Sequence, residues 1–439
     1  MTGGRAIGNL VCGPASGAVR GGRLTWAAFV LLLAGAMPVS AAAQAGALDT
    51  SFGGDGKVTT NLTVGYDYAV DLVLQVDGKL VAAGPASGGG GRFALVRYTD
   101  EGSLDGTFSS DGKAFTNFTS GVDSAFDLIL QPDGRLVAVG RAGGSGGRFA
   151  LARYNVDGTL DVTFGRGGKV TTNFSRGDDS AFGVALQADG KIVAAGRAGG
   201  LGGRFAVARY HGDGRLDTTF SGDGKLTTNF TAGNDLVDHL ALQANEKIVV
   251  AGTAGYNRSN ARFALARYNP NGRLDTSFSG DGRLTTDFTA GFDGAFGLAI
   301  QPDQKIVAVG QARRSMGFAR YRPNGTLDPL FSGDGKATAN FTAGLDYADD
   351  VALSPDGKIV VAGAANFQSS RSRFALVRLN PGGALDTAFS ADGKVTTDFT
   401  PGWDGAFAVE IEPAGGKIVA AGGAGNRGAR FALARYLAE

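Results

Sequence analysis

The sequence predicts an all-β fold, a β-propeller of seven blades with four antiparallel strands in each. Three observations carry this prediction. The segment Arg148–Tyr154 occurs in seven copies along the chain, a Leu-Asp pair recurs seven times with the same period, and the two ends of the chain are offset by one strand. The aspartates of the Leu-Asp pairs show the period of the repeat: Asp49, Asp105, Asp161, Asp217, Asp275, Asp328 and Asp386. A period of this length, held along the chain, is typical of a repeat architecture.

One unit, residues 120–174, contains the strands of one blade. Strands are expected at 123–131, 135–140 and 149–154, followed by a last extended piece at 160–164 and 168–174 with a bulge at 165–168. In the first strand, Phe126, Leu128 and Leu130 are expected on one side, because side chains of a β-strand alternate with a period of two residues. The Pro-Asp-Gly turn at 132–134 joins the first two strands as a hairpin, since Asp and Gly tolerate turn geometry. No stretch after the first 45 residues shows the caps and period of a helix.

The ends of the chain predict closure of the ring. Residues 48–61 read as a last strand without a blade, whereas the chain ends on a third strand at 430–436. Pairing of 57–62 with 430–436 would complete the seventh blade and remove exposed sheet edges. An open solenoid would instead need capping units. The expected blades are 64–118, 120–174, 176–230, 232–288, 290–341, 343–399, and 401–436 with 46–62.

Composition excludes several classes of function. The 439 residues carry 42 Lys and Arg against 41 Asp and Glu, so a strongly basic nucleic-acid binder is not indicated. Cys12 is the only cysteine, which excludes internal disulfides and thiolate zinc sites. The Asp-Gly-Lys turns lack the further acids of a calcium loop. We therefore expect no metal, no cofactor and no nucleic-acid partner, and we expect a monomer.

Residues 1–45 resemble a secretory signal peptide. Arg20 and Arg23 precede an apolar run at 24–37, and a small-residue tail follows at 41–45. A positive region, a short apolar core and an Ala-x-Ala end are the parts of such a signal. The alternative is an uncleaved anchor, although the run is shorter than the ~20 residues of a spanning helix. We expect an exported protein, extracellular, at the cell surface or periplasmic.

The repeat resembles the delta-60 repeat family of β-propellers in exported bacterial proteins. The resemblance is carried by Leu48–Lys57 (Leu-Asp-x-x-Phe-x-x-Asp-Gly-Lys), Gln131–Arg135 and Phe149–Tyr154, and it covers 46–439. It implies a propeller and a location outside the cytoplasm. It implies no activity and no catalytic residues.

Two sets of polar residues recur in every unit. The first precedes each inner strand and is a candidate ligand-binding ring at one mouth of the channel: Asp67, Asp123, Asp179, Asp235, Asp293, Asp346 and Asp404. The alternative for this set is a side-chain cap on the loop between blades. The second set pairs an arginine such as Arg153 with the Leu-Asp aspartate eight residues later, Asp161. We expect a partly buried ion pair in each blade.

Asp238 and His239 form the one asymmetric acid–histidine pair. They replace Phe182 and Gly183 of the preceding unit and fall in an inner strand. A histidine beside an acid is a candidate general base. The alternative is a polar strand residue without a catalytic role, so the sequence names no established catalytic residue.

The variable loops before the first strand and after the second share one face of the expected propeller. They are rich in arginine and aromatic residues: Arg141, Arg197, Tyr256, Asn257, Arg258, Arg313, Arg314, Phe367, Arg371 and Arg427. Such residues are enriched at binding interfaces. The first hypothesis is a non-enzymatic binding or adhesion scaffold for a protein or polysaccharide. The alternative is a secreted hydrolase or lyase that uses Asp238 and His239 at the channel mouth.

Overall fold

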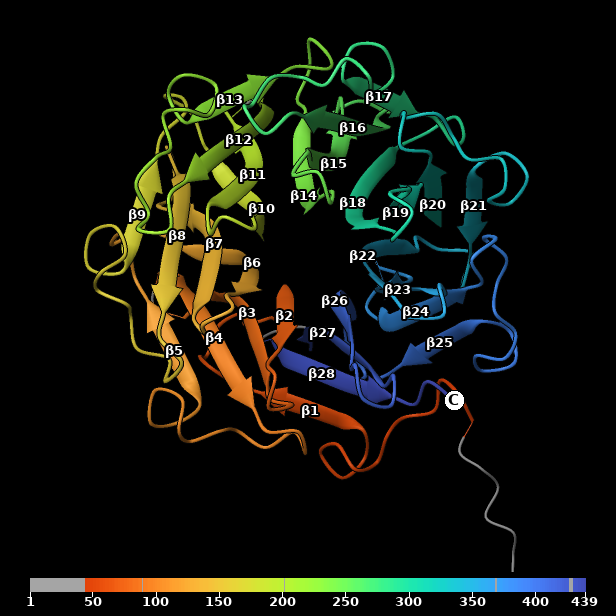
Figure 1. The fold of residues 1–439 in the computed structure, drawn as a ribbon. Helices are drawn as coiled ribbons and strands as arrows, with labels where there is room; N and C mark the ends of the chain where they lie inside the picture. The colour runs from red at the N-terminus through yellow and green to blue at the C-terminus, as the bar shows by residue number, and fades with distance from the viewer. Residues whose placement is uncertain (1–43, 89, 201, 368, 426–428) are drawn as a thin grey trace, which may run out of the picture. The chain divides into compact units, whose positions relative to one another are not determined.

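The computed structural model describes residues 44–88, 90–200, 202–367, 369–425 and 429–439. The expected signal peptide therefore lies outside the described residues, apart from its last two. The described residues form 28 strands and no helix, in seven four-stranded antiparallel sheets that follow one another around a centre (Figure 1). The seven-bladed propeller expected from the sequence is confirmed. Among the described residues there is no helix that could cross a membrane.

Six blades are continuous in sequence, and each runs from an inner strand to an outer strand. The first three are β2 (Asp71–Leu74), β3 (Leu80–Ala86), β4 (Arg92–Tyr98) and β5 (Lys113–Thr116); β6 (Ser124–Leu130), β7 (Leu136–Ala142), β8 (Arg148–Tyr154) and β9 (Lys169–Thr172); and β10 (Ser180–Leu186), β11 (Ile192–Ala198), β12 (Arg204–Tyr210) and β13 (Lys225–Thr228). The next three are β14 (Leu236–Leu242), β15 (Ile248–Ala254), β16 (Arg262–Tyr268) and β17 (Arg283–Thr286); β18 (Asp293–Ile300), β19 (Ile306–Ala312), β20 (Ser315–Tyr321) and β21 (Lys336–Ala339); and β22 (Tyr347–Leu353), β23 (Ile359–Ala365), β24 (Arg373–Leu379) and β25 (Lys394–Thr397).

The seventh blade joins the two ends of the chain. It consists of β26 (Asp404–Ile411), β27 (Ile418–Ala424) and β28 (Arg430–Tyr436), with β1 (Lys57–Thr60) as its outer strand. In Figure 1 the red β1 lies beside the blue β28, and the register pairs Lys57 with Ala434 and Thr60 with Phe431. Closure by the N-terminal strand is thus as expected, and it pairs the edge that β28 would otherwise expose.

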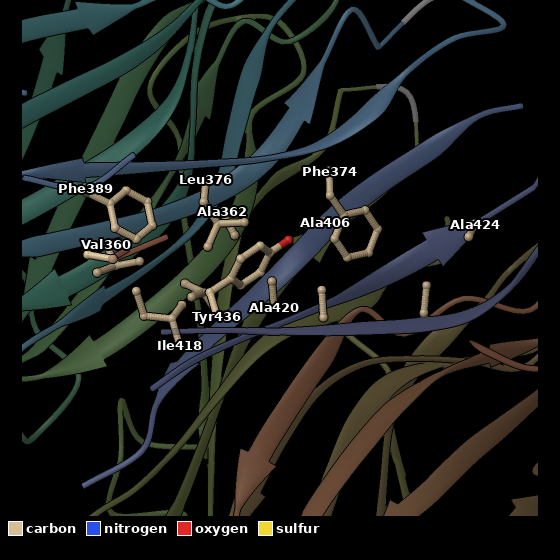
Figure 2. Close-up of a cluster of buried hydrophobic side chains, with 14 residues drawn as sticks. Val360, Ala362, Phe374, Leu376, Phe389, Ala406, Ile418, Ala420, Ala424 and Tyr436 are labelled. Carbon is tan, nitrogen blue, oxygen red and sulfur yellow. The ribbon is translucent and has the colours of Figure 1, made fainter. Parts of the chain in front are cut away.

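The core lies between neighbouring blades. Figure 2 shows the cluster between the sixth and seventh blades, where Phe374 and Leu376 of β24 pack with Ala406 of β26 and Ala420 of β27. These four side chains are fully buried. Large side chains on one sheet meet alanines on the next, so the sheets approach closely without voids. The same division of large and small residues recurs between the other blades.

The expected ion pairs are present in all seven blades. Arg153 Nε donates to Asp161 Oδ2 at 2.8 Å, and the other six pairs have distances of 2.7 to 2.9 Å. The arginine also reaches the next blade, since Arg97 Nη1 donates to the carbonyl oxygen of Val156 at 2.6 Å. Each pair therefore fixes a turn within its blade and links that turn to the following blade.

The inner strands contain a bulge that the sequence did not predict. In the second blade Ala125 pairs with Gly140 and Asp127 with Val139, which leaves Phe126 as the extra residue. A bulge lets two consecutive side chains point to the same side of a strand. Phe126 and Asp127 both line the central cavity, whereas Leu128 packs into the core between blades. The expectation that Phe126 shares a side with Leu128 is therefore wrong.

The last extended piece of each unit is shorter than expected. In the second blade Leu160 forms an isolated bridge with Tyr154, Gly165 and Arg166 bridge to Lys169, and the strand proper is limited to β9. The segment between them turns because Asp161 accepts hydrogen bonds from Thr163 N and Oγ1 and its carbonyl oxygen accepts one from Phe164 N. The expected strand at 160–164 is replaced by this side-chain-stabilised turn.

Candidate binding site in the central channel

The inner strands surround a cavity of about 150 Å³ at the centre of the ring. Because of the bulges, two consecutive residues of an inner strand reach it. The first residues of these pairs, called here the upper layer, are Val70, Phe126, Phe182, Asp238, Phe296, Asp349 and Phe407. The second residues, the lower layer, are Asp71, Asp127, His239 and Asp350. The cavity thus combines four phenyl rings with five carboxyl groups and one imidazole.

The lower-layer carboxylates connect neighbouring blades. Asp71 Oδ2 accepts a hydrogen bond from Leu128 N at 2.8 Å, and Asp350 Oδ2 accepts one from Val409 N at 2.9 Å. Asp127 makes the equivalent bond to Val184 N. In each case the donor belongs to the inner strand of the next blade. These carboxylates are held by the scaffold, so their oxygens are only partly available to a ligand.

Asp71 and Asp127 form a coupled pair. Burial and the neighbouring Asp127 raise the pKa of Asp71 well above its ordinary value. Burial also raises the pKa of Asp127, and His239 partly offsets that rise. Two carboxyl groups in contact favour one shared proton because like charges cannot both be ionised at low cost. Burial and the neighbouring carboxylate therefore disfavour a charge on Asp71.

The candidate acid–histidine pair lies in the cavity but is not joined by a hydrogen bond at its buried atoms. Asp238 Oδ2 and His239 Nδ1 are both buried, and neither has a hydrogen-bond partner among the described residues. Burial and the charge of Asp349 raise the pKa of Asp238 well above its ordinary value. Burial and Asp350 do the same for Asp349. The upper layer therefore holds two carboxyl groups whose charged form is disfavoured by burial, with only Arg197 acting in part against this for Asp238.

The recurring aspartates that precede the inner strands bind the loops of the blades. Asp123 is fully buried and accepts hydrogen bonds from Phe118 N at 2.7 Å, Thr119 N at 3.0 Å and Gly143 N at 2.8 Å. All seven aspartates of the set accept hydrogen bonds from the backbone N–H groups four and five residues earlier. These are the bonds of the loop-capping alternative. The upper-layer residue follows each of them three positions later.

The bond from Gly143 N to Asp123 also places the loop after the second strand beside the loop before the inner strand. We call this end of the channel the variable-loop end. Of the loop residues named from the sequence, Arg427 lies outside the described residues. Tyr256 is among the exposed large side chains, at 42% exposure.

An aromatic belt runs along the variable-loop end of the fifth, sixth, seventh and first blades. Its members are Phe296, Tyr347, Phe367, Trp403, Phe407 and Tyr68. Consecutive ring centroids are 4.6 to 6.1 Å apart. Such spacings are those of interacting aromatic pairs. Phe296 and Phe407 belong to both the belt and the upper layer, so the belt leads into the cavity.

The sequence pointed to Asp238, His239 and Phe367, but not to the rest of this site. Asp349 stands at a position where four other units have Phe. The next position is Asp in three units (Asp71, Asp127 and Asp350) and Gly, His or Ala in the others. A comparison of the units column by column would have found them, because residues that break a repeat carry what is specific to one blade. The residues that recur in every unit belong to the scaffold instead.

Comparison with known proteins agrees with the fold. Six segments match the family model described as "Domain of unknown function (DUF5122) beta-propeller": 75–108, 131–164, 187–220, 243–278, 301–331 and 354–389. No curated protein matches the chain.

Among solved structures, the chain resembles a streptogramin B lyase, with a TM-score of 0.53, 9% identity, and 87% of this chain and 97% of the other covered. It also resembles a catalytically inactive virginiamycin B lyase from Staphylococcus aureus with quinupristin, with a TM-score of 0.53, 10% identity, and 87% and 99% covered. A polysaccharide lyase, an ulvan lyase, has a TM-score of 0.50, 11% identity, and 87% and 96% covered. At these identities the likeness concerns the fold. The six matched segments resemble the repeats of that β-propeller family model, and both comparisons agree with the propeller fold.

Proposed function

We propose that this chain is an exported, non-enzymatic binding protein, built from delta-60 repeats, whose ligand docks at the variable-loop end of the propeller. The observation that carries the proposal is the aromatic belt. Its rings come from four blades and contact one another in an unbroken series. Trp403, Phe367 and Tyr68 are only partly buried. Aromatic side chains that stay partly exposed are the residues most enriched at the energetic centres of binding sites.

Export is supported by the leader at the start of the chain, with its arginines, apolar run and small-residue tail. The ligand class that suits the belt is a polysaccharide or a protein, since both offer flat apolar surface beside polar groups. The anchored carboxylates of the lower layer argue for binding over turnover, because their oxygens hold the scaffold together.

The proposal is tested with the purified protein on a glycan array and against panels of candidate protein ligands. The informative variant is Phe367→Ala, which shortens the belt at a partly buried position. Its matched control is Val162→Ala, which removes an exposed apolar side chain from the turn after β8, away from the variable-loop end. Binding that falls with the first variant and not with the second supports the proposal. Binding that is the same in both variants contradicts it.

Secretion is tested separately by fractionation of cells that express the full chain. Recovery of a shortened protein outside the cytoplasm is the expected result. Full-length protein retained in the cytoplasm would contradict the proposed export.

A secreted hydrolase or lyase is the second candidate function. The observation that favours it is the presence of His239 in a cavity with carboxyl groups of raised pKa, which is the environment of many acid–base catalysts. Incubation of the protein with lactone and polysaccharide panels, followed by product detection, tests this directly. Turnover that disappears in His239→Gln would favour the enzyme over the binding protein.

A further inference from the structure

We propose that the central cavity binds an alkylammonium group, held between the phenyl rings and the two unpaired carboxyl groups of the upper layer. This inference rests on the proposed binding function and names the chemical class of the group that enters from the aromatic belt. It is carried by the lining of the cavity and by the missing partner of Asp238.

The lining offers the two features that recognise an organic cation. Phe126, Phe182, Phe296 and Phe407 give aromatic surface, and the centroids of the first two rings are 4.9 Å apart. Asp349 lies in the ring of upper-layer residues between Phe296 of the preceding blade and Phe407 of the following one. Aromatic rings attract ammonium groups, and quaternary ammonium ligands are commonly held in cages of such rings.

The carboxyl group of Asp238 is the second feature that favours a cation. Its Oδ2 is buried and has no hydrogen-bond partner in the described part of the chain. A buried carboxyl group without a partner costs free energy that a bound cation would offset. An ammonium group in the cavity would meet Asp238 and Asp349 from the fourth and sixth blades at once.

The charged groups around Asp238 decide how binding depends on pH. Asp349, Asp350, Asp71, Asp127 and His239 line the same cavity, and Arg197 of β11 is close enough to lower the pKa of Asp238 in part. The upper-layer carboxyls are neutral more often than ordinary aspartates because burial raises their pKa values. A cation binds the ionised form more strongly, so its binding releases protons and strengthens as the pH rises.

A metal ion fits the site less well. Among the described residues, no group of three or more His, Cys, Asp or Glu side chains is arranged to hold a metal ion. The lower-layer carboxylates already accept backbone hydrogen bonds. Phenyl rings offer no ligand atoms to a hydrated inorganic ion, whereas they pack against the methyl groups of an alkylammonium ion.

Isothermal titration of the purified protein with choline chloride tests the inference. The comparison ligand is dimethylbutanol, the neutral analogue with carbon in place of the choline nitrogen. We expect choline to bind about tenfold or more tightly than the neutral analogue, with a measured heat that changes with the ionisation enthalpy of the buffer because protons are released. Equal binding of the two ligands, or no binding of choline at millimolar concentration, would overturn the inference. Tighter binding of calcium chloride than of choline would overturn it too.

Variants separate the cavity from the rest of the protein. Asp238→Asn should lower the affinity for choline about tenfold or more. Phe296→Leu should lower this affinity several-fold, since leucine keeps apolar volume without the aromatic ring. Asp133→Asn, at an exposed turn, is the matched control and should leave the affinity unchanged. An unchanged affinity in folded Asp238→Asn protein refutes the inference. If choline does not bind while a glycan or protein still binds through the belt, the proposed function stands and only this inference is contradicted.

Discussion

Leu379 and Ala339 lie in the same buried cluster between the fifth and sixth blades, at two positions that hold a hydrogen-bonded tyrosine and threonine elsewhere. At each of the other six interfaces the tyrosine hydroxyl bonds the threonine Oγ1 of the preceding blade at 2.7 to 2.8 Å, as between Tyr154 and Thr116. Both members have changed together at this one interface. A lone hydroxyl buried there would lack its hydrogen-bond partner. The tyrosine and the threonine are therefore either both present or both absent at an interface.

This relationship predicts strong coupling between the two positions. Leu379→Tyr alone buries a hydroxyl beside Ala339 and should destabilise the protein by about 1 to 3 kcal/mol. Ala339→Thr alone should destabilise by a similar amount. The double variant rebuilds the bond and should recover most of the loss. Denaturant unfolding of the four proteins measures the coupling, and additive effects would contradict the pairing.

The buried ion pairs make a second prediction. The side chains of Arg153 and Asp161 are 8% and 5% exposed, and Arg153 also contacts the next blade and the Phe164 ring at 4.7 Å. Arg153→Met leaves the buried carboxylate with only the more distant Arg135, at 3.5 Å, which should cost about 3 kcal/mol. Removing both charges, in Arg153→Met with Asp161→Asn, keeps an acceptor for Thr163 and should cost less than the single change. Thermal unfolding of both variants tests this, with Arg215→Met at an exposed turn of the third blade as control.

The repeat made the scaffold predictable and the site difficult to predict. Arg153 and Asp161 recur in every unit at a fixed spacing, so their contact follows from counting residues across a turn. The positions of Phe126 and Asp127 depend on a one-residue bulge, and no period in the sequence marks it. Asp349 belongs to one blade only. Its significance comes from Phe296, Phe407 and Asp238, which the ring brings near it from distant parts of the chain.

The closure of the ring predicts that residues 46–62 are needed for stability. This segment supplies β1 and also Asp49, whose Oδ2 accepts a hydrogen bond from Arg435 Nε at 2.8 Å. Deletion of 46–62 exposes the edge of β28 and leaves Arg435 without this partner, so the melting temperature should fall sharply. Asp55→Asn, in the exposed turn before β1, is the matched control. A deletion variant as stable as the parent would contradict the closure.

Asp49 gives the closure a pH dependence. Burial alone would raise the pKa of Asp49, but hydrogen bonds from Ser51 and Lys417 and the charge of Arg435 hold that pKa well below its ordinary value. A depressed folded-state pKa adds stability above the unfolded pKa of about 3.9 and loses it as the pH falls. The difference in stability between the parent and Asp49→Asn should therefore shrink below about pH 4. Unfolding curves from pH 3 to 7 measure it.

Glu410 predicts a pH dependence of opposite sign. It lies on β26 two residues after the lower-layer position, and burial together with Asp350 raises its pKa to about 7. The folded protein therefore keeps a proton that the unfolded chain releases at lower pH, so this residue costs stability as the pH rises from 4.5 towards 7.

Glu410→Gln mimics the protonated form and should remove that cost. We expect the variant to match the parent near pH 4.5 and to be more stable at pH 8, by on the order of 2 kcal/mol. Urea unfolding at the two pH values measures the difference. The control is Glu101→Gln, an exposed glutamate in the turn after β4, which should leave the stability unchanged at both pH values. A Glu410→Gln protein that follows the parent at both pH values would show that this carboxyl is ionised and solvated in the folded state.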